Sequence, residues 1–287
     1  MTLRFAVPNK GRLSERSVQI LRQAGFEIED GSDRKLFAAV KDRDLAIMFL
    51  RAQDIVRFVH QGAVDLGITG KDLVLEAGLG VATLIELNYG YCRLSVAVPE
   101  SSGISCIKEV KSGSVVATSF PNLTKKHFSE KGKKVEIARV SGAAEVTPQI
   151  GVADLIVDLV SSGSTLKTNG LKEIDVIMES RAVLIGNKKS VRSKKAGIQE
   201  IVAAIKSVSD AEDKKYLMAD VPVGSLEDIK KFLPGIAGPT IMNIMGRDDV
   251  VAIHVVVDKD KVYDSVNRLK KLGATGILIV PIDRMVP

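Results

Sequence analysis

Short apolar runs alternate with amphipathic stretches along the first two thirds of the chain, and this alternation limits the possible folds more than any other feature. The strand-like runs of the first part are residues 3–7, 44–49, 64–69, 81–87 and 93–98, and helix-like stretches begin near residue 14 and cover 54–61 and 73–77. Alternating strands and helices are typical of mostly parallel sheets with helices on both faces. The sequence therefore predicts an α/β fold.

The pattern is interrupted at residues 99–103, Pro-Glu-Ser-Ser-Gly, and is then repeated, so we expect a second lobe. Its strand-like runs are residues 114–118, 135–140 and 153–160, and a basic helix is predicted from Pro121 to Lys131. Two short segments also resemble each other, Gly-Ala-Val-Asp-Leu-Gly-Ile at 62–68 and Gly-Val-Ala-Asp-Leu-Ile-Val at 151–157. Either they occupy equivalent places in two similar lobes, or the likeness is due to chance.

The last third of the chain has a different order. A long strand-like run at 175–185 leads back to the first lobe, a helix follows over about 194–208, and Ser-Asp-Ala-Glu-Asp-Lys-Lys at 209–215 is typical of a polar linker. The elements beyond it are predicted at 216–221, 226–232, 240–244, 250–257, 261–272 and 276–280. Their order of strand, helix, strand, strand, helix, strand is ferredoxin-like.

A chain of 287 residues is too long for a single hydrophobic core, so several domains are expected. We assign residues 1–98 with 179–210 to a first lobe, 99–178 to a second lobe and 211–287 to a C-terminal domain.

The segment from Glu145 to Leu166 carries the strongest functional signal. An apolar strand ends near Asp158 and is followed by Ser161-Ser162-Gly163-Ser164-Thr165. The hydroxyls can donate to an anion, the glycine lets main-chain N–H groups approach it, and a helix that starts at Thr165 adds its positive end. We interpret the segment as a phosphate-holding loop; the alternative is a plain helix cap, for which serine and threonine are also favoured.

Two further turns follow predicted strands and are expected to meet this loop in a cleft between the lobes. Asn9-Lys10-Gly11-Arg12 places two cations after the first strand, Gly67-Ile68-Thr69-Gly70-Lys71-Asp72 follows the third, and Arg51 precedes a helix. In open α/β folds, ligands bind beyond the carboxyl ends of the strands. Alternatively, the cations are solvated turn residues and the glycines only shape the turns.

Charge and composition exclude several classes of protein. A net charge of +6 suits anionic small substrates, but the chain has no Trp and its few aromatic residues do not interleave with basic clusters, so no nucleic-acid partner is expected. The sequence shows no signal-peptide core and no apolar run of the ~18 residues that a membrane span needs. We expect a cytoplasmic protein without a membrane partner.

Candidate nucleophiles and metal ligands are few. Cys92 and Cys106 lack the spacing of a metal site and are expected to be reduced thiols. His60, His127 and His254 match no metal or triad spacing; we expect His127 to be exposed in its Lys-rich helix and His254 to be packed inside a strand. Without a nucleotide-binding or nucleophile motif, and with no protein metal site expected, the chemistry should depend on positioning and charge neutralisation.

The spaced residues of the phosphate loop and its strand resemble the signature of the ATP phosphoribosyltransferase family, which catalyses the first step of histidine biosynthesis. The matching positions are Glu145, Gly151, Ala153, Ile156, Asp158, Leu159, Ser162, Gly163, Thr165 and Leu166. The segments V-P-N-K-G-R-L-S, D-L-G-I-T-G and A-T-S-F-P-N-L are also similar to motifs of this family, so the resemblance covers nearly the whole chain. The C-terminal module resembles that of the long, self-regulated form.

The resemblance implies a two-lobed catalytic unit similar to type II periplasmic binding proteins, followed by a ferredoxin-like (ACT-like) regulatory domain. It implies transfer of phosphoribosyl from 5-phosphoribosyl 1-pyrophosphate to N1 of ATP, giving N1-(5-phosphoribosyl)-ATP and pyrophosphate, with Mg²⁺ bound to the substrate. It further implies feedback inhibition by histidine and a homo-oligomer, a dimer or hexamer, with no separate regulatory subunit.

Motif positions assign roles to particular residues. The catalytic residues implied are Asp158, Glu145 and Lys10. Those implied to bind phosphoribosyl pyrophosphate are Asp158, Ser161, Ser162, Gly163, Ser164, Thr165 and Leu166. Those implied to face ATP are Lys10, Gly11, Arg51, Gly67, Thr69, Gly70 and Asp72, and those implied to bind histidine are Asp220, Gly238, Thr240 and Gly276. Type I phosphoribosyltransferases have a second acid where Leu159 stands, so this loop alone is not expected to grip both ribose hydroxyls.

Two other functions stay open at this point. A solute-binding protein shares the two-lobed architecture, but it is usually exported and has no use for the phosphate loop. A phosphoribosyltransferase acting on another base would need only a different pocket lining, which the sequence does not reveal.

Overall fold

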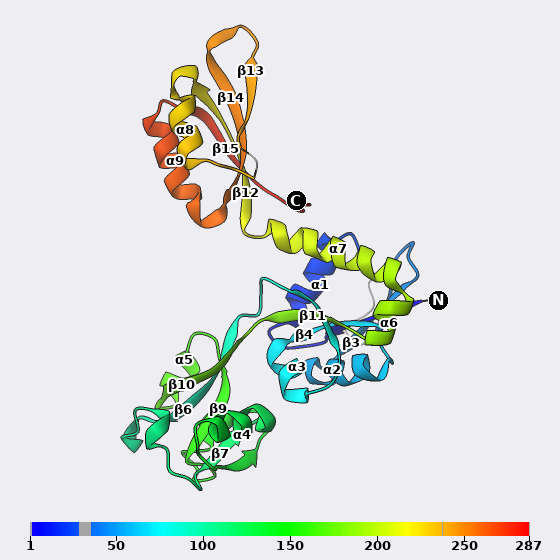
Figure 1. Ribbon diagram of the computed structural model, residues 1–287, viewed down its shortest axis with the longest axis vertical. Coiled ribbons are helices and arrows are strands. Elements are labelled where there is room, and N and C mark those ends of the chain that lie inside the picture. The colour runs from blue at the N-terminus through cyan, green and yellow to red at the C-terminus, as the bar shows by residue number, and fades with distance from the viewer. Residues whose placement is uncertain (1, 29–35, 237, 287) are drawn as a thin grey trace. The chain divides into compact units, whose positions relative to one another are not determined.

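The computed structural model describes residues 2–28, 36–236 and 238–286, and these form two compact units (Figure 1). The larger unit contains the described residues up to 22 and from 26 to 202, and it holds two separate sheets. The smaller unit contains 23–25 and the described residues from 203 onward. In the described part of the chain, no helix is both long and apolar enough to cross a membrane.

The first sheet has six strands in the order β2-β3-β1-β4-β11-β5. The strands are β1 (Leu3–Pro8), β2 (Phe37–Ala39), β3 (Leu45–Leu50), β4 (Leu66–Gly70), β5 (Ala82–Glu86) and β11 (Ala182–Gly186), and the helices of this lobe are α1 (Ser14–Gln23), α2 (Ala52–Gln61), α3 (Lys71–Ala77) and α6 (Lys188–Ser193). Strands β3, β1 and β4 are parallel, whereas β2, β11 and β5 pair antiparallel. The buried face of α2 packs against this sheet through Ile55, Val56 and Val59.

The second sheet has five strands in the order β10-β6-β9-β7-β8. The strands are β6 (Cys92–Pro99), β7 (Val115–Thr118), β8 (Glu136–Arg139), β9 (Leu155–Val160) and β10 (Leu171–Ser180), and the helices are α4 (Pro121–Glu130) and α5 (Ser164–Thr168), with short 3₁₀ turns η1 (Glu100–Ser102), η2 (Ile107–Glu109) and η3 (Ala144–Val146). Strands β8, β7 and β9 are parallel, and β6 and β10 are antiparallel to their neighbours.

Both sheets have the same strand order once the edge strand β2 is set aside. The first reads β3-β1-β4-β11-β5 and the second reads β8-β7-β9-β6-β10. In each case three parallel strands are followed by a strand that arrives from the other lobe, and an antiparallel strand completes the sheet. This is the two-lobed, type II periplasmic-binding-protein-like arrangement that we expected.

The two similar segments lie at equivalent places in these sheets. The main-chain N of Asp65 donates to the carbonyl of Arg4, and its carboxylate accepts from the N of Arg4, each at 2.9 Å. Asp154 exchanges the same two bonds with Val115, at 2.9 and 2.8 Å. Arg4 and Val115 each come just before the residues of β1 and β7 that pair with β4 and β9. The likeness is therefore structural and not due to chance.

The smaller unit contains the ferredoxin-like domain that we predicted. Its strands β12 (Lys214–Pro222), β13 (Thr240–Ile244), β14 (Arg247–Asp258) and β15 (Thr275–Pro281) form an antiparallel sheet of order β13-β14-β12-β15, with helices α8 (Leu226–Phe232) and α9 (Val262–Lys271) and 3₁₀ turns η4 (Val223–Ser225) and η5 (Lys259–Lys261). Leu217, Ala219 and Val221 alternate along β12 and are buried with Ile229 of α8 and Leu269 of α9. Period-two burial of this kind is typical of a strand with one covered face.

Three predictions about the fold were wrong. The sheets are mixed, because the chain crosses between lobes along strands that no helix separates. The run at 175–185 is two strands: β10 belongs to the second sheet and β11 to the first, with Arg181 between them. The segment 209–215 is not a linker, since α7 (Lys195–Ala211) continues through a buried Ser209 and β12 begins at Lys214.

Candidate active site

A pocket of about 160 Å³ lies where β9 ends. Its walls are Glu145, Asp158, Leu159, Val160, Ser161, Ser162, Gly163, Thr165 and Leu166. Except for Ser164, every residue that the resemblance assigns to phosphoribosyl pyrophosphate lines this pocket, together with Glu145 from η3. The strand, the loop and the 3₁₀ turn thus bring both predicted carboxylates and the loop hydroxyls to one place.

The loop presents its hydroxyl groups to solvent and is anchored from below. Ser161, Ser162, Ser164 and Thr165 are exposed, whereas Leu166 is buried in the core of the lobe. Gly163 has φ +81°, a left-handed conformation that glycine adopts without strain. The Ser162 and Ser164 hydroxyls are 2.9 Å apart. An anion would therefore meet several donors held on one tight turn.

Asp158 is half-buried and has a perturbed pKa. Burial raises the pKa of its carboxyl, and the nearby negative charge of Glu145 raises it further, while a hydrogen bond from the main-chain N of Leu159 at 2.7 Å opposes both effects. A ligand that donates hydrogen bonds or carries positive charge would relieve this repulsion. The site is thus suited to a hydroxyl-bearing ligand with an anionic group.

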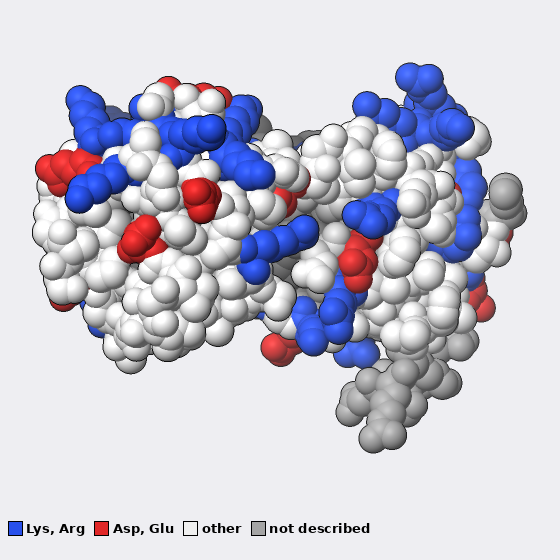
Figure 2. Space-filling model, turned by 90° about the horizontal axis from the view of Figure 1, so that it is seen from below, with Lys and Arg blue, Asp and Glu red and all other residues white. Residues whose placement is uncertain are grey.

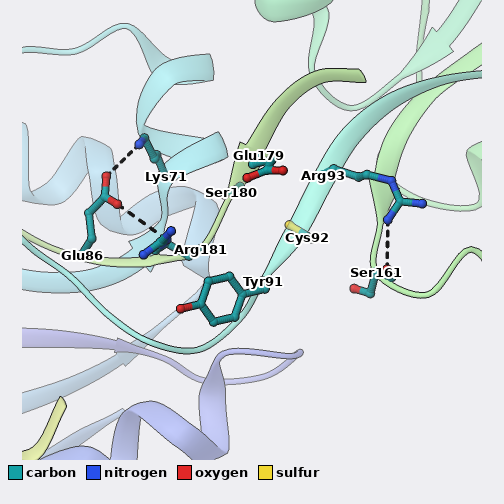
Figure 3. Close-up of a pocket in the computed structure, with 9 residues that line it drawn as sticks. All are labelled: Lys71, Glu86, Tyr91, Cys92, Arg93, Ser161, Glu179, Ser180 and Arg181. Carbon is teal, nitrogen blue, oxygen red and sulfur yellow. Dashed lines mark hydrogen bonds and ion pairs between the residues drawn. The ribbon is translucent and has the colours of Figure 1, made fainter. Parts of the chain in front are cut away.

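A second pocket, of about 320 Å³, adjoins the first (Figure 3). Its walls are Lys71, Glu86, Tyr91, Cys92, Arg93, Ser161, Glu179, Ser180 and Arg181. Because Ser161 lines both pockets, they are neighbours. Figure 3 shows Arg93 and Ser161 on one side of the pocket and Lys71, Glu86 and Arg181 on the other. Lys and Arg side chains also border a hollow on the face shown in Figure 2.

Lys71 and Arg181 of this second pocket pair with Glu86, whereas Arg93 pairs with Glu173 outside the pocket. Glu86 accepts from Lys71 at 2.7 Å and lies 3.6 Å from Arg181, whose guanidinium is 5.0 Å from the centre of the Tyr91 ring. Lys71, Arg93 and Arg181 outnumber the carboxylates of Glu86 and Glu179. The pocket therefore combines a positive balance with one exposed aromatic ring, which suits a planar anionic ligand.

The two cations of the turn after β1, Lys10 and Arg12, have different surroundings. Lys10 is exposed, and Gly11 has φ +82°. The Arg12 guanidinium donates to the carbonyl of Gly90 and lies 3.5 Å from the carboxylate of Asp72. Arg12 is therefore a structural tie between the turn and the segment that leads to β6, not a solvated turn residue.

The segment 67–72, which we predicted to be a turn, consists of the end of β4 and the start of α3, and it is largely internal. Thr69 is fully buried and its hydroxyl donates to the carbonyl of Ala52 at 2.7 Å. Gly67 faces α2, where a Cβ atom would lie 2.5 Å from Ile55 Cγ2. Asp72 is 1% exposed and accepts from the Ser180 hydroxyl.

Gly70, the last residue of β4, has no room for a side chain, because a Cβ atom there would collide with the Asp72 carboxylate. Arg51 is exposed at the start of α2. Lys10, Gly11 and Arg51 are not among the described residues that line either pocket. The assignment of these residues and of 67–72 to ATP stays a prediction.

Sequence reasoning missed the side chains that β6, β10 and the residues next to them contribute. Tyr91, Arg93, Glu179 and Arg181 line the second pocket. Ser95 is directly opposite Asp158 in the pairing of β6 with β9, so both side chains share one face of the sheet. The polar residues at 93 and 95 alternate with apolar ones in an otherwise hydrophobic strand. This pattern could have indicated that one face of the strand borders a polar site.

The exposure predicted for His127 was wrong. His127 is 8% exposed, its Nε2 lies 2.9 Å from Asp175 Oδ2, and its ring meets Phe128 edge-on. Thr124, His127 and Phe128 form the buried stripe of α4 at helical spacing, while the neighbouring lysines face outward. His254 is half-buried and lies 2.8 Å from the Tyr216 hydroxyl, in agreement with its predicted packing.

The residues implied to bind histidine all lie in the ferredoxin-like domain. Asp220 pairs with Thr275 between β12 and β15, and a Cβ atom on Gly276 would lie 3.0 Å from the Asp220 carboxylate. Thr240 begins β13 and Gly238, with φ +103°, precedes it. Gly276 thus leaves room for the Asp220 carboxylate, and the histidine-binding role of the four residues stays a prediction.

The two-lobed α/β fold holds a serine-rich loop beside two carboxylates, as expected for an enzyme that transfers a phosphoribosyl group. Residues 51–207 match the model of ATP phosphoribosyltransferase, and 211–284 match the model of the C-terminal domain of the same family. The chain therefore belongs to the ATP phosphoribosyltransferase family, the pentosyltransferases of histidine biosynthesis, and its C-terminal domain fits the long form.

Individual relatives agree over the full length. The chain is 48% identical to an ATP phosphoribosyltransferase of Methanocaldococcus jannaschii, covering 98% of this chain and 99% of the relative. It is 46% identical to that of Methanosarcina mazei, covering 99% and 100%. Among solved structures, a chain of the ATP phosphoribosyl transferase (HisG:HisZ) complex from Thermotoga maritima is 29% identical with a TM-score of 0.63, covering 71% of this chain and 99% of that one.

Proposed function

We propose that the chain transfers phosphoribosyl from 5-phosphoribosyl 1-pyrophosphate to N1 of ATP, releasing pyrophosphate, as the committed step of histidine biosynthesis in the cytoplasm. The observation that carries this proposal is the pocket at the end of β9, where Asp158, Glu145 and the loop hydroxyls converge. A ribose 5-phosphate needs both kinds of group: donors for the phosphate and acceptors for the ribose hydroxyls.

In the smaller pocket, the proposed orientation of the sugar phosphate has its phosphate group at the serine-rich loop. The 5-phosphate accepts hydrogen bonds from the loop between Ser161 and Thr165, and a ribose hydroxyl donates to Asp158. Such a hydroxyl compensates the Asp158 carboxylate for its burial and for the repulsion by Glu145, which both raise the pKa of Asp158. Charge-assisted hydrogen bonds contribute about 1.5–3 kcal/mol each, so several of them account for a substantial part of substrate affinity.

The reaction requires charge stabilisation more than proton transfer. As the bond from C1 to pyrophosphate breaks, the sugar gains oxocarbenium character, and the Asp158 carboxylate stabilises and orients it. N1 of adenine carries no proton, so its attack needs no general base. Lys10, Gly11, Arg51 and the segment 67–72 face ATP or the departing pyrophosphate in this proposal. The second pocket supports this proposal, because Ser161 lines both pockets and an acceptor bound in the second one would lie beside the sugar.

Mg²⁺ enters this scheme as part of the substrate. Glu145 and Asp158 offer the carboxylate oxygens that Mg²⁺ prefers, and both line the pocket proposed for the sugar. Among the described residues, no group of three or more His, Cys, Asp or Glu is arranged to hold a metal. When bound, the ion supplies charge neutralisation for the leaving pyrophosphate.

We further propose three domains, as predicted from the sequence: a first lobe of 1–98 with 179–210, a second lobe of 99–178, and a regulatory domain of 211–287. Strand β6 (Cys92–Pro99) pairs within the second sheet, so the second lobe begins at about residue 92 and not at 99. The regulatory domain binds histidine through Asp220, Gly238, Thr240 and Gly276 and assembles the chain into dimers and hexamers. No separate regulatory subunit is required. The Thermotoga maritima chain belongs to a HisG:HisZ complex and aligns with 71% of the present chain, which carries a C-terminal domain of its own at 211–284.

The function is tested with purified protein, ATP, phosphoribosyl pyrophosphate and Mg²⁺, following the absorbance of the N1 adduct. Asp158→Ala should abolish product formation while the fold is retained. Asp154→Asn serves as a control, because Asp154 is a carboxylate of the same lobe that lies outside both pockets. A wild-type protein that forms no ATP-dependent product, or that prefers another base, would overturn the proposal. Deleting residues after about 210 should remove the inhibition by histidine.

A further inference from the structure

Arg93 lies on β6 at the point where β9 gives way to the phosphate loop. In the register of the second sheet it is opposite Val160, the last residue of β9, and also opposite Glu179 of β10. The loop starts one residue later, at Ser161. Arg93 is therefore the charged side chain of β6 that is nearest in register to the loop.

The guanidinium of Arg93 joins the loop to β10. Its Nε lies 2.9 Å from both carboxylate oxygens of Glu173, and its Nη1 donates to the carbonyl oxygen of Ser161 at 3.2 Å. Its Nη2 is 4.0 Å from the position that a Cβ atom would have on Gly163. The Arg93 guanidinium thus contacts the Glu173 carboxylate through Nε and the main chain of the loop through Nη1.

A simple sheet-stabilising role explains this arrangement poorly. The carboxylate that Arg93 meets belongs to Glu173, which pairs with Ala97, whereas Glu179 is the residue directly opposite Arg93. The register of β10 shifts between Glu173 and Asp175, and such an irregularity re-aims side chains. The irregular strand turns the Glu173 carboxylate toward the guanidinium that holds Ser161.

We propose that Arg93 is a positioning residue for the phosphoribosyl pocket, which rests on the proposed assignment of phosphoribosyl pyrophosphate to that pocket. Anchored by Glu173, it fixes the Ser161 carbonyl and so orients the main-chain N–H groups of the loop toward the 5-phosphate. Its positive charge beside Gly163 adds to the attraction for that phosphate. Arg93 also lines the second pocket, so it forms part of the wall between the two substrates.

A loop that is already ordered loses less conformational freedom when the phosphate binds. Removing the anchor should therefore weaken the binding of phosphoribosyl pyrophosphate more than that of ATP. The expected increase in the KM for phosphoribosyl pyrophosphate is about ten- to a hundredfold for Arg93→Ala, the range of one charge-assisted hydrogen bond. A smaller increase is expected for Glu173→Gln, which keeps the shape of the anchor but removes its charge.

The experiment compares Arg93→Ala, Arg93→Lys and Glu173→Gln in the full-length protein. KM for each substrate, kcat and the melting temperature are measured for each variant. Arg93→Lys retains the charge but lacks the planar fork that joins Glu173 to Ser161, so it should rescue only part of the loss. Arg247→Lys is the matched control, because Arg247 makes a similar fork with Asp249 in the C-terminal domain; its KM values should equal those of the wild type.

The outcomes separate the inference from the function on which it rests. A rise in the KM for phosphoribosyl pyrophosphate at unchanged KM for ATP supports the positioning role. A lower melting temperature with both KM values unchanged reduces Arg93 to a structural ion pair and overturns it, as does an equal rise of both KM values. If Arg93→Ala does not fold, Glu173→Gln and Arg93→Lys decide the question. Absence of turnover in the wild type would instead refute the proposed function.

Discussion

Glu76 of the first lobe caps a helix of the second lobe through Asn122. Its carboxylate accepts hydrogen bonds from the main-chain N of Asn122 and of Leu123, each at 2.9 Å, and its carbonyl accepts from the Asn122 amide at 2.9 Å. Pro121 begins α4, so these N–H groups belong to its first turn and have no partner within the helix. A side chain of α3 thus supplies the cap that α4 lacks in its own sequence.

We predict that Glu76→Ala lowers the free energy of unfolding by about 1–2 kcal/mol, because it leaves two helical N–H groups without their acceptor. Urea denaturation measures the change. Glu76→Gln should retain part of the cap. Glu130→Ala at the other end of α4 removes only an exposed carboxylate, 4.0 Å from Lys126, and should cost less than about 0.5 kcal/mol. Equal losses of unfolding free energy in the two alanine variants would show that the hydrogen bonds from Glu76 to α4 do not stabilise the protein.

Asp158→Asn should stabilise the protein while it abolishes most of its activity. The pKa of Asp158 is raised in the folded state, mainly by burial, so the native state binds more protons than the unfolded state above the ordinary value of about 3.9. Stability is therefore lost as the pH rises through the folded pKa, and the ionised carboxylate still costs stability at pH 7.

Melting temperatures measured against pH test this sign. The Asn variant should melt higher than the wild type at pH 7, and the difference should shrink as the pH falls below the raised pKa. Its kcat should fall by at least about a hundredfold, the usual effect of losing one electrostatic contact to the transition state. Asp154→Asn is the control and should bring no such gain. A lower melting temperature for Asp158→Asn at neutral pH would refute the argument.

Ser95→Ala should leave stability unchanged or raise it by up to about 1 kcal/mol. Ser95 is fully buried, and its hydroxyl has no hydrogen-bond partner among the described residues, so the mutation removes a polar group that gains nothing from folding. Ser17 is the matched control: it is equally buried, but its hydroxyl lies 2.6 Å from the Leu13 carbonyl and 2.8 Å from the Tyr89 hydroxyl. Ser17→Ala should cost about 1–2 kcal/mol in chemical denaturation; similar losses for both would contradict the prediction.

Gly276→Ala should weaken inhibition by histidine at unchanged kcat. Its Cβ atom would stand 3.0 Å from the Asp220 carboxylate and displace it. Gly246→Ala, in the turn between β13 and β14, is the control for backbone strain. Its φ is also positive, but nothing lies within 4 Å of its Cβ position, so this variant is strained without touching a carboxylate. Both variants should lose some stability, but only Gly276→Ala should need more histidine for half-maximal inhibition. Wild-type sensitivity of that variant would place the effector elsewhere.

The helices and strands were largely predictable from the sequence, but the pairing of the strands was not. Strands such as β1, and helix α8 at its full extent, follow from local patterns. Residues 171–186 illustrate the difficulty: no glycine, proline or helix-like stretch interrupts the strand-like pattern before Gly186, and only the tertiary structure shows that the chain changes sheets at Arg181. The three-residue strand β2 is too short to leave a pattern.

The site was predictable where it is built from one continuous segment. The pocket residues between Asp158 and Leu166 are neighbours in sequence, so their motif indicated both the loop and its carboxylate. Arg93 and Ser95 come close to these residues only through the pairing of β6 with β9, and Glu173 contacts Arg93 from β10. His127 was misjudged because its lysine neighbours dominate the local composition, although its spacing to Thr124 indicated the buried face of α4.

The order of the strands along the chain allows the second lobe to be excised from the first. All five strands of the second sheet come from the continuous stretch 92–180, whereas the first sheet needs β5 before that stretch and β11 after it. Glu86 and Val183 are already antiparallel partners across β5 and β11. The second lobe is therefore an insertion into the tip of a β-hairpin of the first. A short turn in its place would close that hairpin, and the excised lobe would keep its sheet intact.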